Sequence, residues 1–223
     1  MRAIKPPHET RTRILDAAEE LFMLHGFEGA SMRLLTSKAE VNLAAVNYHF
    51  GSKDALIEAV FRRRLDPMNA ARIAALERLE AEAGGRPLAP ELVIRAFVGE
   101  SLRMIEDARG GGRNFIRLLG RTYTDPSKEI RALIGQMYAP AMERYKAALE
   151  HALPQMPREE LVWRMHFMFG TLAYTLAATD TVQLIAGVKP EDRYDARLLE
   201  ERLSAFLASG LAAPIHKAVK KAA

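Results

Sequence analysis

Residue types that bind nucleic acids cluster in one short stretch, NLAAVNYHFGSK. Asn47 can pair through two hydrogen bonds with the edge of an adenine. Tyr48 and His49 offer hydrogen-bond donors to phosphate oxygens. Ser52 and Lys53 open a new helical pattern, where backbone N–H groups and a cation would meet an anion. The stretch therefore predicts a surface that contacts both the bases and the backbone of DNA.

The apolar residues of the same stretch fit this prediction. Small or apolar side chains at Leu43, Ala44 and Ala45 would let a helix come close to base edges and thymine methyl groups. Val46 and Phe50 are the expected inward anchors of that helix. The full set of residues expected to face DNA is Arg33, Asn42, Leu43, Ala44, Ala45, Asn47, Tyr48, His49, Ser52 and Lys53.

A long first helix must brace this stretch. From Glu9 onward the apolar residues recur at helical spacing, and Thr10 or Thr12 could cap the start. Gly26 is the expected end of the helix. Its predicted inward stripe consists of Ile14, Leu15, Ala18, Leu21 and Phe22.

Three polar residues are expected to begin the next three helices. Ser31 caps the second helix, whose residues Met32, Leu35 and Ala39 would face the first. That helix must end near 40–42, because Asn42 is the natural N-cap of the third. Ser52 begins the fourth, with a buried stripe of Leu56, Ile57, Val60 and Phe61.

Two short helices joined by a turn and braced by a longer one form a helix-turn-helix, whose second helix lies in the DNA major groove. Residues 8–53 are therefore expected to form a DNA-binding domain. The periodicity alone also fits a small helical bundle with a polar surface. The phosphate-compatible groups gathered in one stretch favour DNA binding over that alternative.

The N-terminal part of the chain resembles the DNA-binding region of TetR-type regulators over AAEELFMLHGFEGASMRLLTSKAEVNLAAVNYHFGSKDALIEAVF. It shares a first helix ending in Gly-Phe, a capped second helix and an aromatic-rich third helix. Two residues depart from the family pattern, because Glu40 stands at the turn glycine and Asn47 at the recognition-helix tyrosine. Glu40 would then adopt a positive φ with some strain, and Asn47 is assigned to base reading. The resemblance implies a dimeric transcription regulator, probed by an operator and an inducer.

The rest of the chain is also expected to be helical, so the predicted fold class is all-α. Asp66-Pro67 reads as a helix boundary and a joint between domains. Residues 54–66 would then be a connecting helix and 67–214 a ligand-binding and dimerisation domain. The helices expected in that domain span 67–83, 90–107, 113–123, 127–152, 158–181 and 193–212. The run Arg62-Arg63-Arg64 is expected to be a solvated face rather than a DNA contact.

The helix at 158–181 has apolar residues nearly all round, which indicates burial on more than one side. One stripe contains Leu161, Met165, Met168, Phe169, Leu172 and Leu176, and the other contains Trp163, Phe167, Gly170 and Tyr174. With the similar final helix, 193–212, it would form a four-helix contact in a homodimer. The alternative is one thick monomeric core.

Methionine and aromatic residues accumulate in the same domain, which suits either an adaptable apolar pocket or plain core. Spacing alone favours core, but the chain also resembles the fatty-acid-responsive PsrA-like branch of the family from Phe115 to Ala178. That resemblance implies a long-chain fatty acid or acyl-CoA effector, with Arg117 or Arg121 facing its head. The residues expected to bind it are Met104, Phe115, Leu119, Arg121, Met137, Met142, Met168, Phe169 and Leu172.

Other functional classes find little support. The chain has no cysteine, and its six histidines show no metal-ligand spacing. Phosphate-loop, dinucleotide and Gly-x-Ser-x-Gly patterns are missing too, so we expect no enzyme, no metal and no cofactor. His166 is expected to be a hydrogen-bonded core histidine. A multidrug sensor of the same fold, or a helical lipid-binding protein that does not bind DNA, remains the alternative.

Location follows from equally simple observations. The start, MRAIKPPHETRTR, lacks the apolar region of a signal peptide. The longest uncharged apolar run, Met165 to Thr179, is too short to span a membrane. A cysteine-free chain fits a reducing compartment, so we expect a cytoplasmic protein without a membrane partner.

Overall fold

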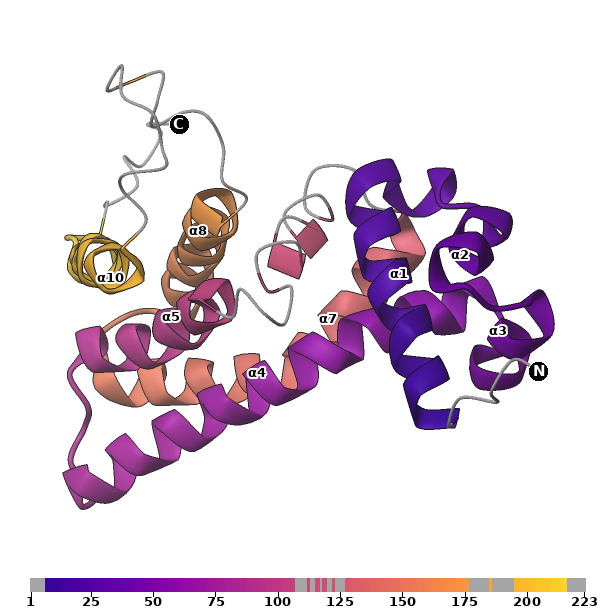
Figure 1. Cartoon of the computed structure of the whole chain (residues 1–223). Coiled ribbons are helices and arrows are strands. Elements are labelled where there is room, and N and C mark those ends of the chain that lie inside the picture. Colours follow the sequence, from indigo (N-terminus) through magenta and orange to yellow (C-terminus); the bar gives the residue numbers. More distant parts are fainter. Residues whose placement is uncertain are drawn as a thin grey trace.

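The computed structural model describes residues 7–106, 112, 115, 116, 118, 119, 122, 127–176, 185 and 195–215. Over these residues the regular structure is helical and includes no strand, which agrees with the all-α prediction. The helices are α1 (Pro7–Gly29), α2 (Met32–Ala39), α3 (Leu43–Phe50), α4 (Lys53–Ala83), α5 (Pro90–Glu106), α7 (Lys128–Ala152), α8 (Arg158–Leu176) and α10 (Ala196–Ala212) (Figure 1).

Side-chain caps begin the three helices after α1, as the sequence predicts. The Ser31 hydroxyl accepts a hydrogen bond from the Leu34 N–H at 3.2 Å. Asn42 Oδ1 accepts one from Ala45 at 2.8 Å, and Ser52 Oγ accepts one from Ala55 at 3.1 Å. Each cap satisfies a backbone N–H that the helix itself leaves without a partner. The boundaries of α2, α3 and α4 therefore follow from local chemistry.

The first helix differs from the prediction at its start. It begins at Pro7, so neither Thr10 nor Thr12 is its N-cap. Proline suits this place because the first helical turn needs no N–H donor. At the other end the backbone leaves the helical region at Gly26, with φ 72°, as expected.

Helix α4 corrects the expected boundary at Asp66-Pro67. It runs without interruption from Lys53 to Ala83 and contains Pro67 within it. A proline inside a helix costs about 3 kcal/mol. Burial on both sides of Pro67 offsets this cost, because Leu65, Met68 and Leu76 are all core residues. The segments expected at 54–66 and 67–83 are thus one helix.

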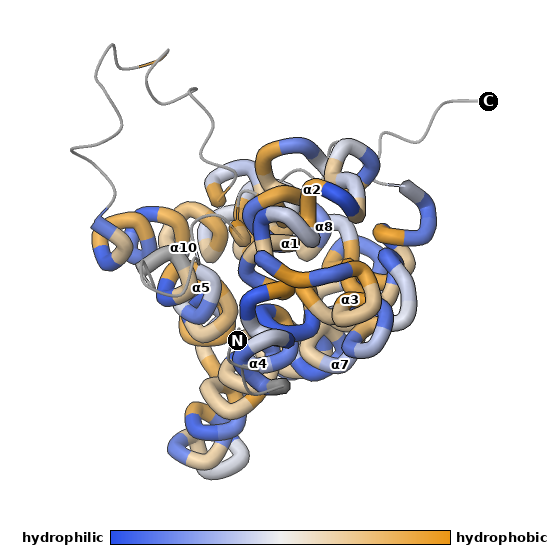
Figure 2. The backbone as a smooth tube through the Cα atoms, turned by 45° about the vertical axis from the view of Figure 1, so that its right-hand side comes forward, coloured by the Kyte–Doolittle hydropathy of each residue, from blue (hydrophilic) through white to orange (hydrophobic). Residues whose placement is uncertain are grey.

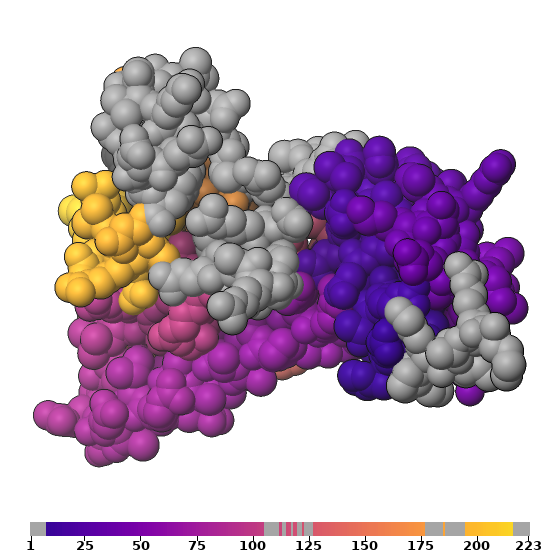
Figure 3. Space-filling model, viewed as in Figure 1, coloured from indigo at the N-terminus to yellow at the C-terminus, as the bar shows by residue number. Residues whose placement is uncertain are grey.

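Two hydrophobic cores lie along α4. The first joins α1, α2, α3 and the first half of α4 to Phe115, Leu118, Leu119 and the start of α7. The second joins Leu76 on α4 to α5, α7, α8 and α10. Figures 1 and 3 show the α1–α3 lobe at one end of the molecule and α10 at the other. Helix α4 therefore connects the two parts through continuous packing rather than through a linker.

The arginine run on α4 is only partly solvated, which corrects a second expectation. Arg63 pairs with Asp16 at 2.6 Å and with Glu19, and Arg64 pairs with Glu19 at 3.1 Å. Burial disfavours the charged form of Arg63, but the bonds to Glu19 and Asp16 outweigh it, so its pKa lies above the ordinary value. Arg62 alone keeps the expected exposed position, beside Glu58. These pairs join α4 to α1.

Candidate functional site

Helix α3 is held by one side and exposed on the other. Val46 is 1% exposed in the first core, whereas Tyr48 is 83% exposed. Leu43, Ala44 and Asn47 are exposed on the same short helix. Figure 2 shows α3 on the near side of the lobe, beside α1 and α2. The sequence-predicted residues of α3 are thus brought together on one accessible face.

The flanking caps limit what the polar residues there can do. The Asn42 oxygen is committed to the α3 cap and the Ser52 oxygen to the α4 cap. Asn42 can therefore offer only its amide N–H donors to a phosphate. His49 is half-buried, with its ring 5.2 Å from that of Tyr48. Backbone N–H groups at the start of α4 lie next to this cluster and suit an anion.

Cations around α3 fall into two groups. Lys38 is held by Glu20 at 2.7 Å. Among the described residues, Arg33 and Lys53 form no ion pair, and Arg33 is exposed. An anion on this surface would therefore meet Arg33 and Lys53 before Lys38.

Two arginines of α1 contribute here without having been predicted. Arg11 stacks over the Phe50 ring at 5.4 Å from its centroid. Arg13 donates to the Glu40 carbonyl at 3.1 Å and also to the Ala39 carbonyl, so it holds the turn between α2 and α3. Glu40 has the left-handed conformation that the sequence comparison required, with φ 51°. The arginines gave no signal because their partners lie far away along the chain.

A second candidate site is a cavity of about 20 Å³ in the C-terminal part. It is lined by Met68, Arg72, Phe97, Ser101, Ile116, Leu119, Tyr138, Phe169, Leu172, Ala173 and Leu176. A water molecule needs at least about 10–15 Å³ by this measure. The cavity in this conformation therefore holds a water molecule and not an acyl chain.

The predicted ligand-binding residues divide between this cavity and the packed cores. Leu119, Phe169 and Leu172 line the cavity. Met104, Phe115, Met137, Met142 and Met168 pack in the two cores and are not among the residues that line it. Arg117 and Arg121 lie outside the described residues. Sequence reasoning missed Arg72, Ser101 and Tyr138, since no pattern marks polar residues that meet from different helices.

Arg72 is the centre of the polar contacts at this cavity. Its side chain is 2% exposed, and its three described hydrogen bonds go to Phe97 O at 3.2 Å, Asn69 Oδ1 at 3.0 Å and Ser101 Oγ at 2.5 Å. The Tyr145 hydroxyl donates to the Arg72 carbonyl at 2.8 Å. Burial raises the pKa of Tyr145 well above its ordinary value.

An apolar face extends over α8 and α10. Trp163, Phe167 and Tyr174 on α8 and Phe206 on α10 are each more than half exposed. Gly170 lies on this face, and a Cβ added there would meet nothing within 4 Å. His166 is exposed beside Trp163 and Phe167, which corrects the expected core histidine. The two helices therefore present a surface suited to a second protein chain.

Two further observations concern the described residues alone. No group of three histidine, aspartate or glutamate side chains in this part of the chain could hold a metal ion. None of its helices is long and apolar enough to cross a bilayer.

Sequence comparisons match two family models. One, "Tetracyclin repressor-like, C-terminal domain", matches residues 95–210, more than half of the chain. The other, "Bacterial regulatory proteins, tetR family", matches residues 14–60. The regulator UidR of Escherichia coli is 45% identical over 51 residues, or 23% of this chain and 26% of UidR. The regulator SrpR of Pseudomonas putida is 40% identical over 60 residues, or 27% of this chain and 28% of SrpR. The chain thus aligns with about a quarter of these relatives' length.

Solved structures resemble the whole fold. FadR from Bacillus subtilis, in complex with stearoyl-CoA, has a TM-score of 0.63 at 15% identity, covering 89% of this chain and 98% of FadR. A putative fatty acid metabolism regulator from Clostridium perfringens has a TM-score of 0.66 at 17% identity, covering 92% of this chain and 100% of the regulator. At these identities the likeness is one of fold.

Proposed function

Because the chain belongs to the TetR family of bacterial regulatory proteins, and is thus a regulator rather than an enzyme, we propose that it binds an operator as a homodimer. The operator would be an inverted repeat, with half-sites about 34 Å or a multiple apart, and the protein would act as a repressor. A hydrophobic effector would release it from DNA. The observation that carries this proposal is α3, anchored by Val46 and exposed along its other side.

Residues on the α3 surface would divide by role. Asn47 would read a base, and Leu43, Ala44 and Ala45 would let the helix approach the groove floor closely. The phosphates would meet Arg33, Asn42, Tyr48, His49, Ser52 and Lys53. Residues 8–53 would thus act as the DNA-binding domain, 54–66 as the connecting part of α4, and 67–214 as the effector and dimerisation domain.

The two-fold partner would be a second copy of this chain, packed against α8 and α10. Their exposed aromatic residues supply apolar area, and Gly170 lets another helix approach closely. Two such helices from each subunit would make a four-helix contact. A two-fold axis there would place two copies of α3 for an inverted repeat.

The effector we propose is a long-chain fatty acid or its acyl-CoA, as in the PsrA-like branch. The described apolar lining of Leu119, Phe169 and Leu172 suits an acyl chain, and each buried CH₂ contributes about 0.8 kcal/mol. Met104, Phe115, Met137, Met142, Met168 and Arg121 remain predicted contacts that widening of the cavity would have to expose. A ligand that binds a wider state better than the DNA-competent state would act as a switch.

Selection from random duplex DNA at moderate salt tests the central proposal. We expect an enriched inverted repeat, and binding that weakens steeply with salt because phosphates are neutralised. The absence of any enriched inverted repeat would contradict it. A helical lipid-binding protein would bind acyl ligands but no DNA, and a multidrug sensor would prefer flat, bulky compounds. A protein that regulates chromosomal genes would work in the cytoplasm.

A further inference from the structure

Arg72 places a positive charge inside the apolar part of the C-terminal domain. It is the largest of the side chains that are less than 2% or so exposed. Its guanidinium carbon lies 3.7 Å from the centre of the Phe97 ring. Burying an ion costs several kcal/mol unless good partners surround it. The partners described here, the Phe97 carbonyl, the Asn69 amide and the Ser101 hydroxyl, are neutral oxygens.

The same guanidinium lines the cavity, which gives the cavity two chemically different sides. Arg72, Ser101 and Tyr138 make the polar side. Phe169, Leu172 and other apolar residues of α8 make the opposite one. An amphipathic molecule with one anionic end matches this arrangement, because each of its ends would meet a side of like character.

We propose that Arg72, with Ser101 and Tyr138, binds the anionic head of an amphipathic effector. A carboxylate takes over the Nη2 bond that the Ser101 hydroxyl now accepts at 2.5 Å. Charge-assisted bonds are about twice as strong as neutral ones, and a guanidinium can present two parallel donors to a carboxylate. The acyl tail then lies against Phe169, Leu172 and Leu176. This inference rests on the proposed function and assigns the head of its effector to α4.

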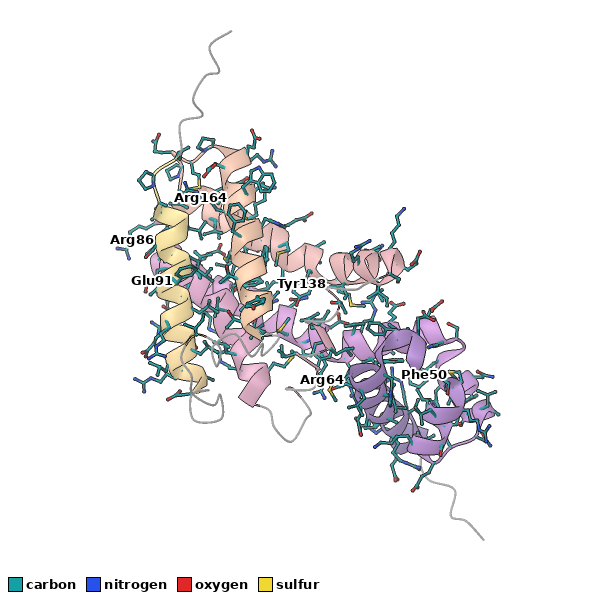
Figure 4. All side chains as sticks on the ribbon, turned by 90° about the horizontal axis from the view of Figure 1, so that it is seen from above. Phe50, Arg64, Arg86, Glu91, Tyr138 and Arg164 are labelled. Carbon is teal, nitrogen blue, oxygen red and sulfur yellow. The ribbon has the colours of Figure 1, made fainter. Side chains whose placement is uncertain are left out.

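A comparison within the molecule supports a ligand role for Arg72 rather than a purely structural one. Arg164 is another buried arginine of the domain, at 7% exposure. It donates to the Leu211 and Ala213 carbonyls, each at 2.6 Å, and caps the end of α10. Figure 4 shows it beside α10, away from Tyr138. Arg164 does not line the cavity, so it stabilises the fold alone.

The acids packed nearby do not occupy the polar side of the cavity. Glu100, next to Ser101 on α5, pairs with Arg103. Glu80, further along α4, pairs with Arg144 at 2.7 Å. Neither glutamate is among the residues that line the cavity. A ligand anion at Arg72 therefore adds a negative charge on a side where the described lining has none.

The cavity must widen before a tail can enter, because about 20 Å³ holds only a water molecule. The liganded protein is thus a second conformation, and the free energy of opening lowers the apparent affinity. Asn69 ties Arg72 to α7, where its amide donates to the Met137 carbonyl at 3.0 Å. A head that rearranges the Arg72 bonds therefore changes contacts among α4, α5 and α7.

The test compares hexadecanoate with hexadecanol on the full-length protein, because these probes differ only in the charged head. Binding is measured by displacement of the neutral dye Nile red. We expect the unaltered protein to prefer the acid by about tenfold or more, as hydrogen bonds to charged groups are worth that much. Arg72→Met should reduce the preference to about twofold or less while hexadecanol still binds.

Two variants complete the test. Arg164→Met removes an equally buried arginine and should lower Tm while leaving the preference for the acid unchanged. Ser101→Ala removes one hydroxyl and should lower the preference by about threefold, which keeps the test decisive if Arg72→Met does not fold. Equal binding of both probes by the unaltered protein, or equal weakening of both by Arg72→Met, overturns the inference alone. A protein that binds neither probe overturns both the inference and the proposed effector, whatever the DNA selection shows.

Discussion

Arg13 of α1 donates a hydrogen bond to the backbone carbonyl of Glu40, 27 residues further along, at 3.1 Å. Among the described residues, Glu40 is the one non-glycine residue with positive φ. A non-glycine residue in that conformation is disfavoured by about 1–2 kcal/mol. The guanidinium therefore supports a strained turn that sets the angle between α2 and α3.

We expect Arg13→Met to destabilise the protein by about 1–2 kcal/mol, because two turn carbonyls and the Glu40 carboxylate lose a charged donor. Glu40→Gly in the same background should restore part of this, since glycine adopts positive φ without strain. Thermal unfolding of the single and double variants measures both effects. If Glu40→Gly is equally harmful with and without Arg13, the turn is not what Arg13 supports.

Asn47→Ala should cost about 1–3 kcal/mol of operator binding and relax preference at one base position. Lys53→Ala should instead weaken binding to every sequence and reduce the salt dependence by about one phosphate contact. Lys38→Ala is the matched control, because Lys38 is already held by Glu20 and should change binding little. Binding isotherms on the selected site and its single-base variants decide between the roles. Uniform weakening by Asn47→Ala would rule out base reading.

Gly170→Asp should give a folded monomer that no longer binds the full operator. A side chain at Gly170 meets nothing within 4 Å in the single chain, so the substitution leaves the subunit intact while placing a charge in the proposed dimer contact. Gly135→Asp on α7 is the control, because that site is equally open. Sedimentation at several concentrations reports the oligomeric state. A Gly170→Asp protein that remains dimeric would place the interface elsewhere.

Tyr145 makes part of the stability sensitive to alkaline pH. Burial raises its pKa above the ordinary 10.0, so the unfolded chain loses the proton at a lower pH than the folded one. The contribution is therefore complete below pH 10.0 and is lost as pH rises from there towards the folded pKa. Tyr145→Phe should cost about 1 kcal/mol at neutral pH, through the lost bond to the Arg72 carbonyl. Its stability should then fall less steeply above pH 10.0 than that of the unaltered protein. Urea unfolding across this range measures the difference, and identical slopes would contradict the prediction.

Local chemistry accounts for what the sequence alone could predict. The caps at Ser31, Asn42 and Ser52 act within three residues, so the boundaries of α2, α3 and α4 could be assigned in advance. The positive φ of Glu40 followed from its place at a family turn. The apolar stripes likewise identified the α8 and α10 face, since helical spacing alone fixes which residues share a side.

Contacts between distant parts of the chain account for what was missed. Pro67 obeys a local rule that favours a helix end, but packing on both sides of it keeps α4 continuous. Arg63 and Arg64 have partners on α1 that no charge run reveals. Pocket and core residues are both apolar, so spacing could not separate Leu119 from Phe115. Arg72 gave no signal because its partners come from a different helix.

The continuity of α4 makes one rigid rod out of two places that the chain could have kept apart. Lys53 and Arg72 are 19 residues apart in an unbroken helix, a rise of about 28 Å. Tilting such a rod by only about 5° carries one end about 2.5 Å sideways relative to the other. In a dimer that motion would occur on both sides of the axis, and the two recognition helices would separate or converge by about twice as much. Against half-sites whose spacing is fixed by the pitch of DNA, a mismatch of a few ångströms costs both copies of α3 their fit in the groove at once.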